Sequence, residues 1–140
     1  QNKTLLLYHI VCPVRYRKKV FSEAVKQTLV EICTGIQERY DIYFVEVGTD
    51  QDHVHYLVQS IPSEAVSSIV RTIKSLTEIK IFERHKEVKK ELWGGKFWSS
   101  GYYANTVGSH GTEKVISNYV KNQGYKYHKL YKTQKTLFEY

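Results

Sequence analysis

The sequence predicts one α+β domain over residues 1–140, built on a four-stranded antiparallel sheet with two helices on one face. Two observations predict this fold. Strand-like runs rich in β-branched and aromatic residues alternate with two longer segments of helical apolar periodicity, in the order β-α-β-β-α-β. The two middle runs are separated only by Gly48-Thr49-Asp50, which predicts a hairpin. This order is the ferredoxin-like, or split βαβ, plan that RRM domains share.

The first strand and the first helix are predicted within residues 5–36. Leu5 to Cys12 is nearly continuously apolar, which suits a central strand that is covered on both faces, and Pro13 ends it. Ser22 is a suitable N-cap for a helix. The helix carries one apolar stripe, formed by Val25, Leu29, Ile32, Cys33 and Ile36.

The hairpin consists of Asp41–Val47 and a second strand that begins at the run from Asp52 to Val58. Because side chains alternate along a strand, His53 and His55 point to the same face, with Leu57 beyond them. The opposite face should meet the two helices and is formed by Val54, Tyr56 and Val58.

The second helix is predicted to begin after Pro62, with Ser63 as its cap, and to run past Leu76. The basic stretch over residues 80–90 should be a helix end that frays into an exposed loop. Phe97–Val107 reads as the fourth strand, with a bend at Gly101.

A third helix is predicted from Thr112 to Gly124, followed by a basic, aromatic tail over residues 125–140. Within this helix Tyr119 and Gln123 are four residues apart and so lie one turn apart on the same side. With two helices on the other face, only this helix remains to cover His53 and His55. It could therefore present a phenol and an amide to the histidine pair.

The composition favours a nucleic-acid partner over a membrane. The formal charge is +7, and the chain contains 12 tyrosines, whose rings can stack on bases. No apolar stretch approaches the ~18 residues of a membrane span, and Cys12 and Cys33 are expected to be reduced core thiols, so a cytoplasmic protein is expected. Candidate DNA-binding residues are Arg15, Arg17, Lys18, Lys19, Arg71 and Lys74.

The motif His53-Val54-His55, together with Tyr119-x-x-x-Gln123 on a C-terminal helix, resembles the HUH single-tyrosine transposases of the smallest bacterial insertion sequences. The resemblance spans nearly the whole chain. Four blocks of the chain resemble family blocks and follow in the expected order. They are residues 16–21, 52–58, 98–102 and 119–123, and the second and fourth contain the motifs just named. One position differs from the common form, since Tyr56 stands where many members have an aliphatic residue.

The resemblance implies that His53, His55 and Gln123 bind a divalent metal and that Tyr119 attacks single-stranded DNA at hairpin-bearing element ends. Attack would form a 5′-phosphotyrosine and release a 3′-OH, and a second DNA end could reverse the step without ATP. Two imidazoles and an amide oxygen would admit Mg²⁺ or Mn²⁺. Such an enzyme would work in the bacterial or archaeal cytoplasm, near the nucleoid.

The resemblance also implies a homodimer, in which each active site combines the histidines of one chain with Tyr119 of the other. The connection over residues 108–111 has a glycine at each end and could swing the third helix to either chain.

Two alternatives remain. A non-catalytic single-stranded nucleic-acid-binding module of RRM-like fold would need an aromatic RNP block, and the chain has none. It would also leave the histidine pair unexplained. A two-histidine phosphodiesterase would need two H-x-[S/T] blocks, and the chain has a single one, at residues 110–112.

Overall fold

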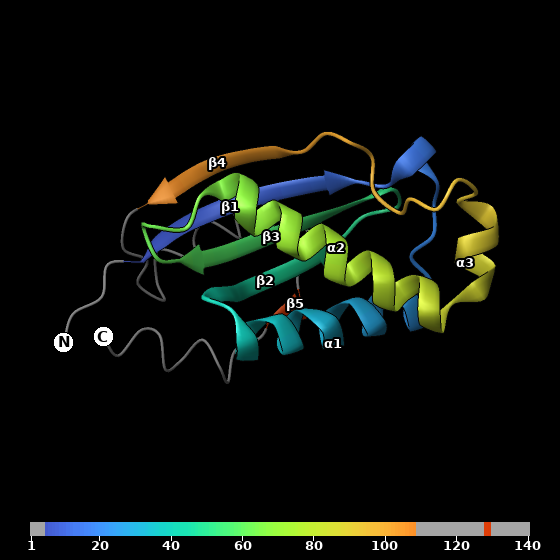
Figure 1. Ribbon diagram of the computed structural model, residues 1–140, viewed down its shortest axis with the longest axis horizontal. Helices are drawn as coiled ribbons and strands as arrows, with labels where there is room; N and C mark the ends of the chain where they lie inside the picture. Colours follow the sequence, from blue (N-terminus) through green and yellow to red (C-terminus); the bar gives the residue numbers. More distant parts are fainter. Residues whose placement is uncertain (1–4, 109–127, 130–140) are drawn as a thin grey trace.

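The computed structural model describes residues 5–108 and 128–129. The fold of this part of the chain is α+β with an antiparallel sheet, as predicted (Figure 1). The elements are β1 (Leu6–Pro13), the short 3-10 helix η1 (Arg15–Arg17), α1 (Glu23–Arg39), β2 (Ile42–Thr49), β3 (His53–Ser60), α2 (Val66–Arg84), α3 (Lys86–Glu91), β4 (Tyr103–Gly108) and β5 (His128–Lys129).

The strands lie side by side in the order β4-β1-β3-β2-β5, and every neighbouring pair is antiparallel. The sheet therefore has one strand more than the four predicted. The added strand, β5, pairs with the outer edge of β2 through Glu46 opposite Lys129 and Val47 opposite His128. An outer strand leaves backbone N–H and C=O groups unpaired, and β5 satisfies part of that edge.

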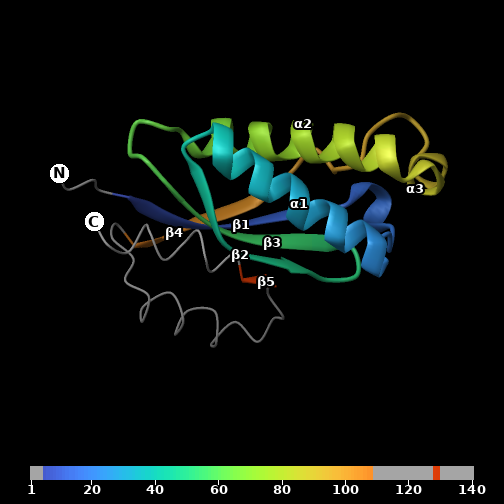
Figure 2. The ribbon, with the colours of Figure 1, turned by 90° about the horizontal axis from the view of Figure 1, so that it is seen from below.

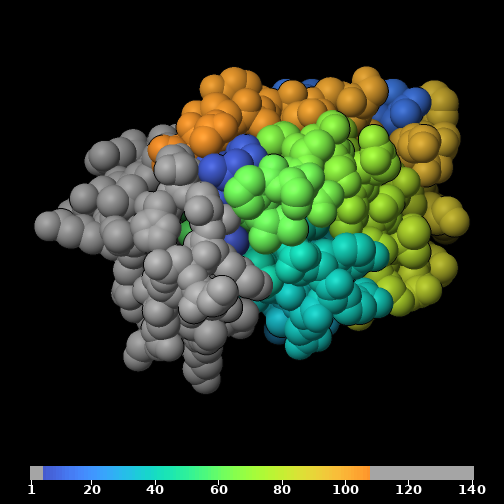
Figure 3. Space-filling model, turned by 60° about the vertical axis from the view of Figure 1, so that its left-hand side comes forward, coloured from blue at the N-terminus to red at the C-terminus, as the bar shows by residue number. Residues whose placement is uncertain are grey.

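Both long helices, α1 and α2, cover the same face of the sheet (Figure 2). Their surfaces adjoin in the space-filling view, where α1 is cyan and the first part of α2 is green (Figure 3). The main core lies between these helices and the sheet, and Val54, Tyr56 and Val58 of β3 are all fully buried in it. The predicted orientation of β3 is thus confirmed, including the inward position of Tyr56.

The other face of the sheet, here called the second face, carries His53, His55 and Leu57. Leu57 is buried there in a small cluster with Leu7 and Val45, apart from the main core. A bulge in β2 between Phe44 and Glu46 directs Val45 to this second face. The histidines therefore lie opposite the helices, as the alternation predicted.

The helix ends agree only in part with the sequence prediction. Ser22 caps α1, because its Oγ accepts a hydrogen bond from Val25 N at 3.3 Å. The prediction of Ser63 as the cap of α2 is wrong: residues 61–64 form a turn, closed by Glu64 N donating to Ile61 O, and the helix starts at Val66. The basic stretch is helical rather than frayed, since the buried Val88 anchors α3.

The fourth strand is shorter than predicted and begins only at Tyr103. Residues 97 and 98 are instead packed into the core, where Phe97 and Trp98 are buried. Side chains of α2 hold this segment: Glu78 accepts from Phe97 N, and Lys74 Nζ donates to two carbonyls, those of Ser99 at 2.9 Å and Gly101 at 3.0 Å. The backbone pairing of this segment is limited to an isolated antiparallel bridge between Trp98 and Val14, so the regular ladder with β1 begins only at Tyr103.

The two cysteines are buried and unpaired, in agreement with the prediction of reduced core thiols. Burial raises the pKa of Cys12 to about 12 and raises that of Cys33 further, so neither thiol is reactive at neutral pH. None of the helices in the described part of the chain combines the length and apolar character that a membrane span needs.

Candidate active site

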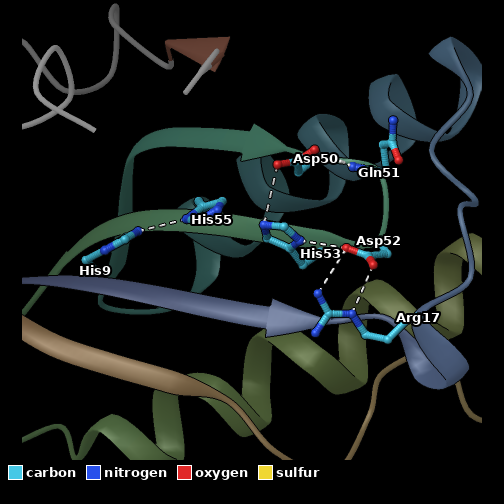
Figure 4. Close-up of polar contacts among 7 residues, drawn as sticks. All are labelled: His9, Arg17, Asp50, Gln51, Asp52, His53 and His55. Carbon is cyan, nitrogen blue, oxygen red and sulfur yellow. Dashed lines mark hydrogen bonds and ion pairs between the residues drawn. The ribbon is translucent and has the colours of Figure 1, made fainter. Parts of the chain in front are cut away.

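The candidate site is built on the first residues of β3. His53 is the first residue of that strand, directly after the turn that follows β2, and His55 is two residues on. Their rings meet edge to face on the second face of the sheet, with centroids 4.8 Å apart (Figure 4). The alternation of a strand thus brings two imidazoles together on a rigid base.

A carboxylate fixes the orientation of His53. Asp52 Oδ1 lies 2.8 Å from His53 Nδ1, whereas Asp50 Oδ2 is 3.6 Å from Nε2 of the same ring, which is too far for a hydrogen bond. A carboxylate only accepts, so the hydrogen of a neutral His53 sits on Nδ1. The nitrogen with the lone pair is then Nε2.

Arg17 in turn holds Asp52. Its Nε donates to Asp52 Oδ2 at 3.0 Å and a terminal nitrogen donates to Oδ1 at 3.3 Å. The hydrogen bond from Arg17, followed by that from His53, lowers the pKa of Asp52 to about 2. The turn itself is tied to the end of β1, because Val14 N donates to the carbonyl of Asp52 at 2.8 Å. Asp52 is therefore an anion fixed beside His53 at all ordinary pH values.

A third histidine, His9 of β1, lies next to His55. Its Nε2 is 3.0 Å from His55 Nδ1, and the two rings stack with centroids 5.2 Å apart. Both side chains are buried. Burial, followed by the nearby rings of His53 and His9, lowers the pKa of His55 to about 4, and burial lowers that of His9. These two rings are neutral at pH 7, the form in which imidazole binds metals.

The described residues supply only part of the ligand set that a divalent metal needs. His53 and His55 are close together, and each has Nδ1 engaged by a neighbouring side chain, so Nε2 would be the coordinating nitrogen of both. Within residues 5–108 and 128–129, however, no three His, Cys, Asp or Glu side chains form a group that could hold a metal ion. The described residues thus offer two ligands of the complete set.

A basic pocket of about 310 Å³ lies at the edge of α2, at some remove in sequence from the histidines. It is lined by Trp98, three serines, the carboxylate of Glu78 and four cations, which are Arg15, Arg71, Lys74 and Lys96. Four cations against one carboxylate leave the pocket basic. Three of the six residues predicted to bind DNA thus share one pocket, although Lys74 also holds the loop before β4. Of the other three, Arg17 is paired with Asp52, and Lys18 and Lys19 are exposed.

Comparison with known proteins identifies the family. The family model described as "Transposase IS200 like" matches residues 2–123. The chain belongs to the IS200-like transposase family. This transposase is 30% identical over 118 residues to the ISDra2 transposase TnpA of Deinococcus radiodurans, covering 84% of each chain. It is also 30% identical over 116 residues to the transposase for insertion sequence element IS200 of Salmonella typhimurium, covering 83% of this chain and 75% of the relative.

Solved structures agree with the family. A crystal structure from Deinococcus radiodurans R1 superposes with a TM-score of 0.69 at 27% identity, covering 88% of this transposase and 93% of that chain. The structure of a REP-associated tyrosine transposase bound to a REP hairpin superposes with a TM-score of 0.54 over 81% of this chain and 61% of that chain. At 11% identity the second likeness concerns the fold alone.

Of the residues predicted to bind metal or to act as the nucleophile, the structure brings together His53 and His55. Tyr119 and Gln123 lie outside the described residues, as do the whole segment predicted as the third helix and most of the tail. Sequence reasoning missed His9 and the orienting role of Asp52. The signal for His9 was present, because it is a polar residue inside an otherwise apolar central strand. The signal for Asp52 was its position beside the first histidine.

Proposed function

We propose that this transposase cleaves and rejoins single-stranded DNA at hairpin-bearing ends of an insertion sequence, using Tyr119 as the nucleophile. The observation that carries the proposal is the pair His53 and His55 on one face of β3, each with Nδ1 held by a neighbour. A pair of imidazoles with fixed orientation, His55 buried and His53 half-buried, has no evident use in a purely structural sheet. Membership of the transposase family supplies the type of reaction.

His53 and His55 would hold a divalent metal through Nε2, with the amide oxygen of Gln123 as a third ligand. This set suits Mg²⁺ or Mn²⁺, and the imidazoles favour Mn²⁺ in affinity. When bound, such an ion withdraws charge from the phosphoryl oxygens of the scissile phosphate. Asp52 and His9 orient the two rings, so that neither histidine needs to rotate when the DNA arrives.

In the proposed reaction the phenol oxygen of Tyr119 forms a bond to phosphorus, and the bond from phosphorus to the 3′ oxygen breaks. The phenol loses its proton and the leaving oxygen gains one, which yields a 5′-phosphotyrosine and a free 3′-OH. One phosphodiester replaces another, so a 3′-OH from a second DNA end can reverse the step without an energy source. An unperturbed phenol has a pKa of about 10 and needs such charge withdrawal to react at neutral pH.

The basic pocket formed by Arg15, Arg71, Lys74 and Lys96 is the proposed site for DNA phosphates. The REP-associated tyrosine transposase, which shares this fold, is bound to a REP hairpin, and we propose a hairpin-bearing substrate for this chain as well. We further propose a homodimer in which Tyr119 of one chain serves the histidines of the other. The reaction would take place in the cytoplasm of a bacterial or archaeal cell.

The deciding experiment incubates the protein with single-stranded DNA that carries the hairpin-bearing ends flanking its gene, in Mg²⁺ or Mn²⁺. A covalent adduct that survives a denaturing gel is expected. Tyr119→Phe should abolish the adduct and leave hairpin binding nearly unchanged, because it removes one oxygen and almost no volume. An adduct that persists would move the nucleophile elsewhere, first to Tyr125 or Tyr127. Binding without any adduct in the wild-type protein would favour the non-catalytic RRM-like module.

A further inference from the structure

Three consecutive side chains of η1 serve three different parts of the molecule. Arg15 lines the basic pocket, Tyr16 stacks on Trp93, and Arg17 holds the Asp52 that orients His53. The turn and the segment around α3 lie at the same end of the sheet, the end at which β1 finishes (Figure 1). Tyr16, which stacks on Trp93, thus lies in the chain between a residue of the proposed phosphate pocket and the residue that holds Asp52.

The two rings of this pair are exposed. Trp93 is 70% exposed and Tyr16 is 47% exposed, and their centroids are 5.5 Å apart with an interplanar angle of 27°. The other tryptophan, Trp98, is by contrast 4% exposed and contributes to the core. Packing therefore does not account for the position of Trp93. A large indole that the core does not use leaves an aromatic face in solvent.

The backbone on both sides of the pair is in unusual conformations. Tyr16 has φ 60° and Arg17 has φ 51°, in the left-handed region that residues with side chains avoid. After Trp93 the chain turns through Gly94 and Gly95, with φ of 98° and 78°. The surrounding contacts, including the hydrogen bond from Arg17 N to Val14 O, hold the turn despite its cost. Strain of this kind is characteristic of functional sites.

The charges around the pair suit a nucleic acid better than a protein. The guanidinium of Arg15 lies 5.0 Å from the centroid of the Tyr16 ring, and Lys18 beyond the turn is exposed. Lys96, in the same loop as Trp93, lines the basic pocket with Arg15. Aromatic faces among cations are how proteins bind unpaired bases together with their phosphates. Duplex DNA does not fit, since its bases stack on one another and offer no free face.

We propose that Tyr16 and Trp93 form a stacking platform for an unpaired base of single-stranded DNA, with Arg15 and Lys96 neutralising the adjoining phosphates. The proposal rests on the proposed function in that the ligand is the same DNA substrate. It adds a site for the single strand between the hairpin and the scissile phosphate. A base held on Trp93 would fix the path of that strand toward His53.

The test measures the fluorescence anisotropy of a fluorescein-labelled 12-nucleotide oligothymidine as each variant is added in the presence of a chelator, so that no cleavage can occur. Tryptophan fluorescence of the wild-type protein is followed alongside with the unlabelled oligothymidine. The sequence has two tryptophans, and Trp98 is buried, so quenching of the solvent-exposed emission reports Trp93. Trp93→Leu should weaken binding about 5-fold to 150-fold, the range for losing one stacked base. The salt dependence should stay the same, because no charge is lost. Trp93→Phe should keep most of the affinity.

The matched control is Tyr40→Leu, since Tyr40 is 44% exposed at the end of α1, away from η1. It should leave the affinity for oligothymidine unchanged. Equal affinity of Trp93→Leu and wild-type protein, or a wild-type protein that does not bind oligothymidine, would overturn the platform. Because the assay contains no metal, it is independent of the adduct experiment. Binding through Trp93 without any adduct would refute the catalytic proposal and leave the platform standing.

Discussion

His9 Nε2 lies 3.0 Å from His55 Nδ1, across the boundary between β1 and β3. In a contact between two neutral imidazoles, one nitrogen carries the hydrogen and the other accepts it. If His55 binds a metal through Nε2, its own hydrogen must sit on Nδ1, and His9 must be the acceptor. His9 would then be a positioning residue that selects the tautomer of His55, as Asp52 does for His53.

His9→Leu is therefore expected to leave His55 as a mixture of tautomers and to weaken Mn²⁺ binding about 10-fold to 100-fold, the usual effect of removing an orienting partner. The ¹⁵N shifts of the His55 ring in the metal-free protein report the tautomer directly. His9→Gln should restore much of the affinity, because its amide oxygen also accepts. Leu7→Ala, on the same strand and face, is the control: it should lower stability without changing the tautomer. An unchanged His55 tautomer in His9→Leu would refute the role of His9.

Arg17 was predicted to bind DNA, and its contact with Asp52 suggests a different main role. We expect Arg17→Gln to weaken Mn²⁺ binding several-fold, less than the effect of about 10-fold to 100-fold expected for Asp52→Ala. Lys18→Gln should leave metal binding unchanged. It should reduce the slope of log DNA affinity against log salt concentration by about one. Isothermal titration calorimetry with Mn²⁺ distinguishes a role of Arg17 in metal binding from a role in DNA binding only. If Arg17→Gln behaved as Lys18→Gln does, Arg17 would be a phosphate ligand only.

Mixing two inactive variants tests the shared active site. Tyr119→Phe keeps the histidines and His53→Ala keeps the tyrosine, so a mixed dimer would contain one complete site if Tyr119 works on its partner. We expect adduct formation to return on mixing, to less than half of the wild-type level. The control is mass spectrometry of the mixture, which shows whether subunits exchange. Exchange without any returned activity would place Tyr119 on its own chain.

The hydroxyl of Tyr56 is fully buried and has no hydrogen-bond partner among the residues that the structure describes. Burying such a group costs about 1–3 kcal/mol, so Tyr56→Phe should leave the free energy of unfolding unchanged or raise it by about 1 kcal/mol. Urea unfolding measures the difference. Tyr43→Phe serves as the comparison, because that hydroxyl donates to Asp41 Oδ1 and its loss should slightly destabilise the protein. A marked loss of stability in Tyr56→Phe would reveal a partner for the hydroxyl.

Local patterns in the sequence determined the α+β class and the orientation of β3. Alternation alone placed His53 and His55 on the face opposite to Val54, Tyr56 and Val58, because successive side chains in a strand point to opposite sides. The cap at Ser22 was likewise predictable, since it depends on residues one turn apart. By contrast, residues 97–102 read as a strand but are held by Lys74 and Glu78 of α2, which are distant in sequence.

The partners of the two histidines were decided by the tertiary structure alone. His9 is 46 residues from His55 and Arg17 is 35 residues from Asp52, and the register between β1 and β3 brings each pair together. The same holds for Tyr16 and Trp93, which meet only because Arg15 N donates to the carbonyl of Phe97 and joins the two segments. Periodicity carries information about which face a side chain occupies. It carries none about which distant side chain shares that face, because register depends on the packing of the whole sheet.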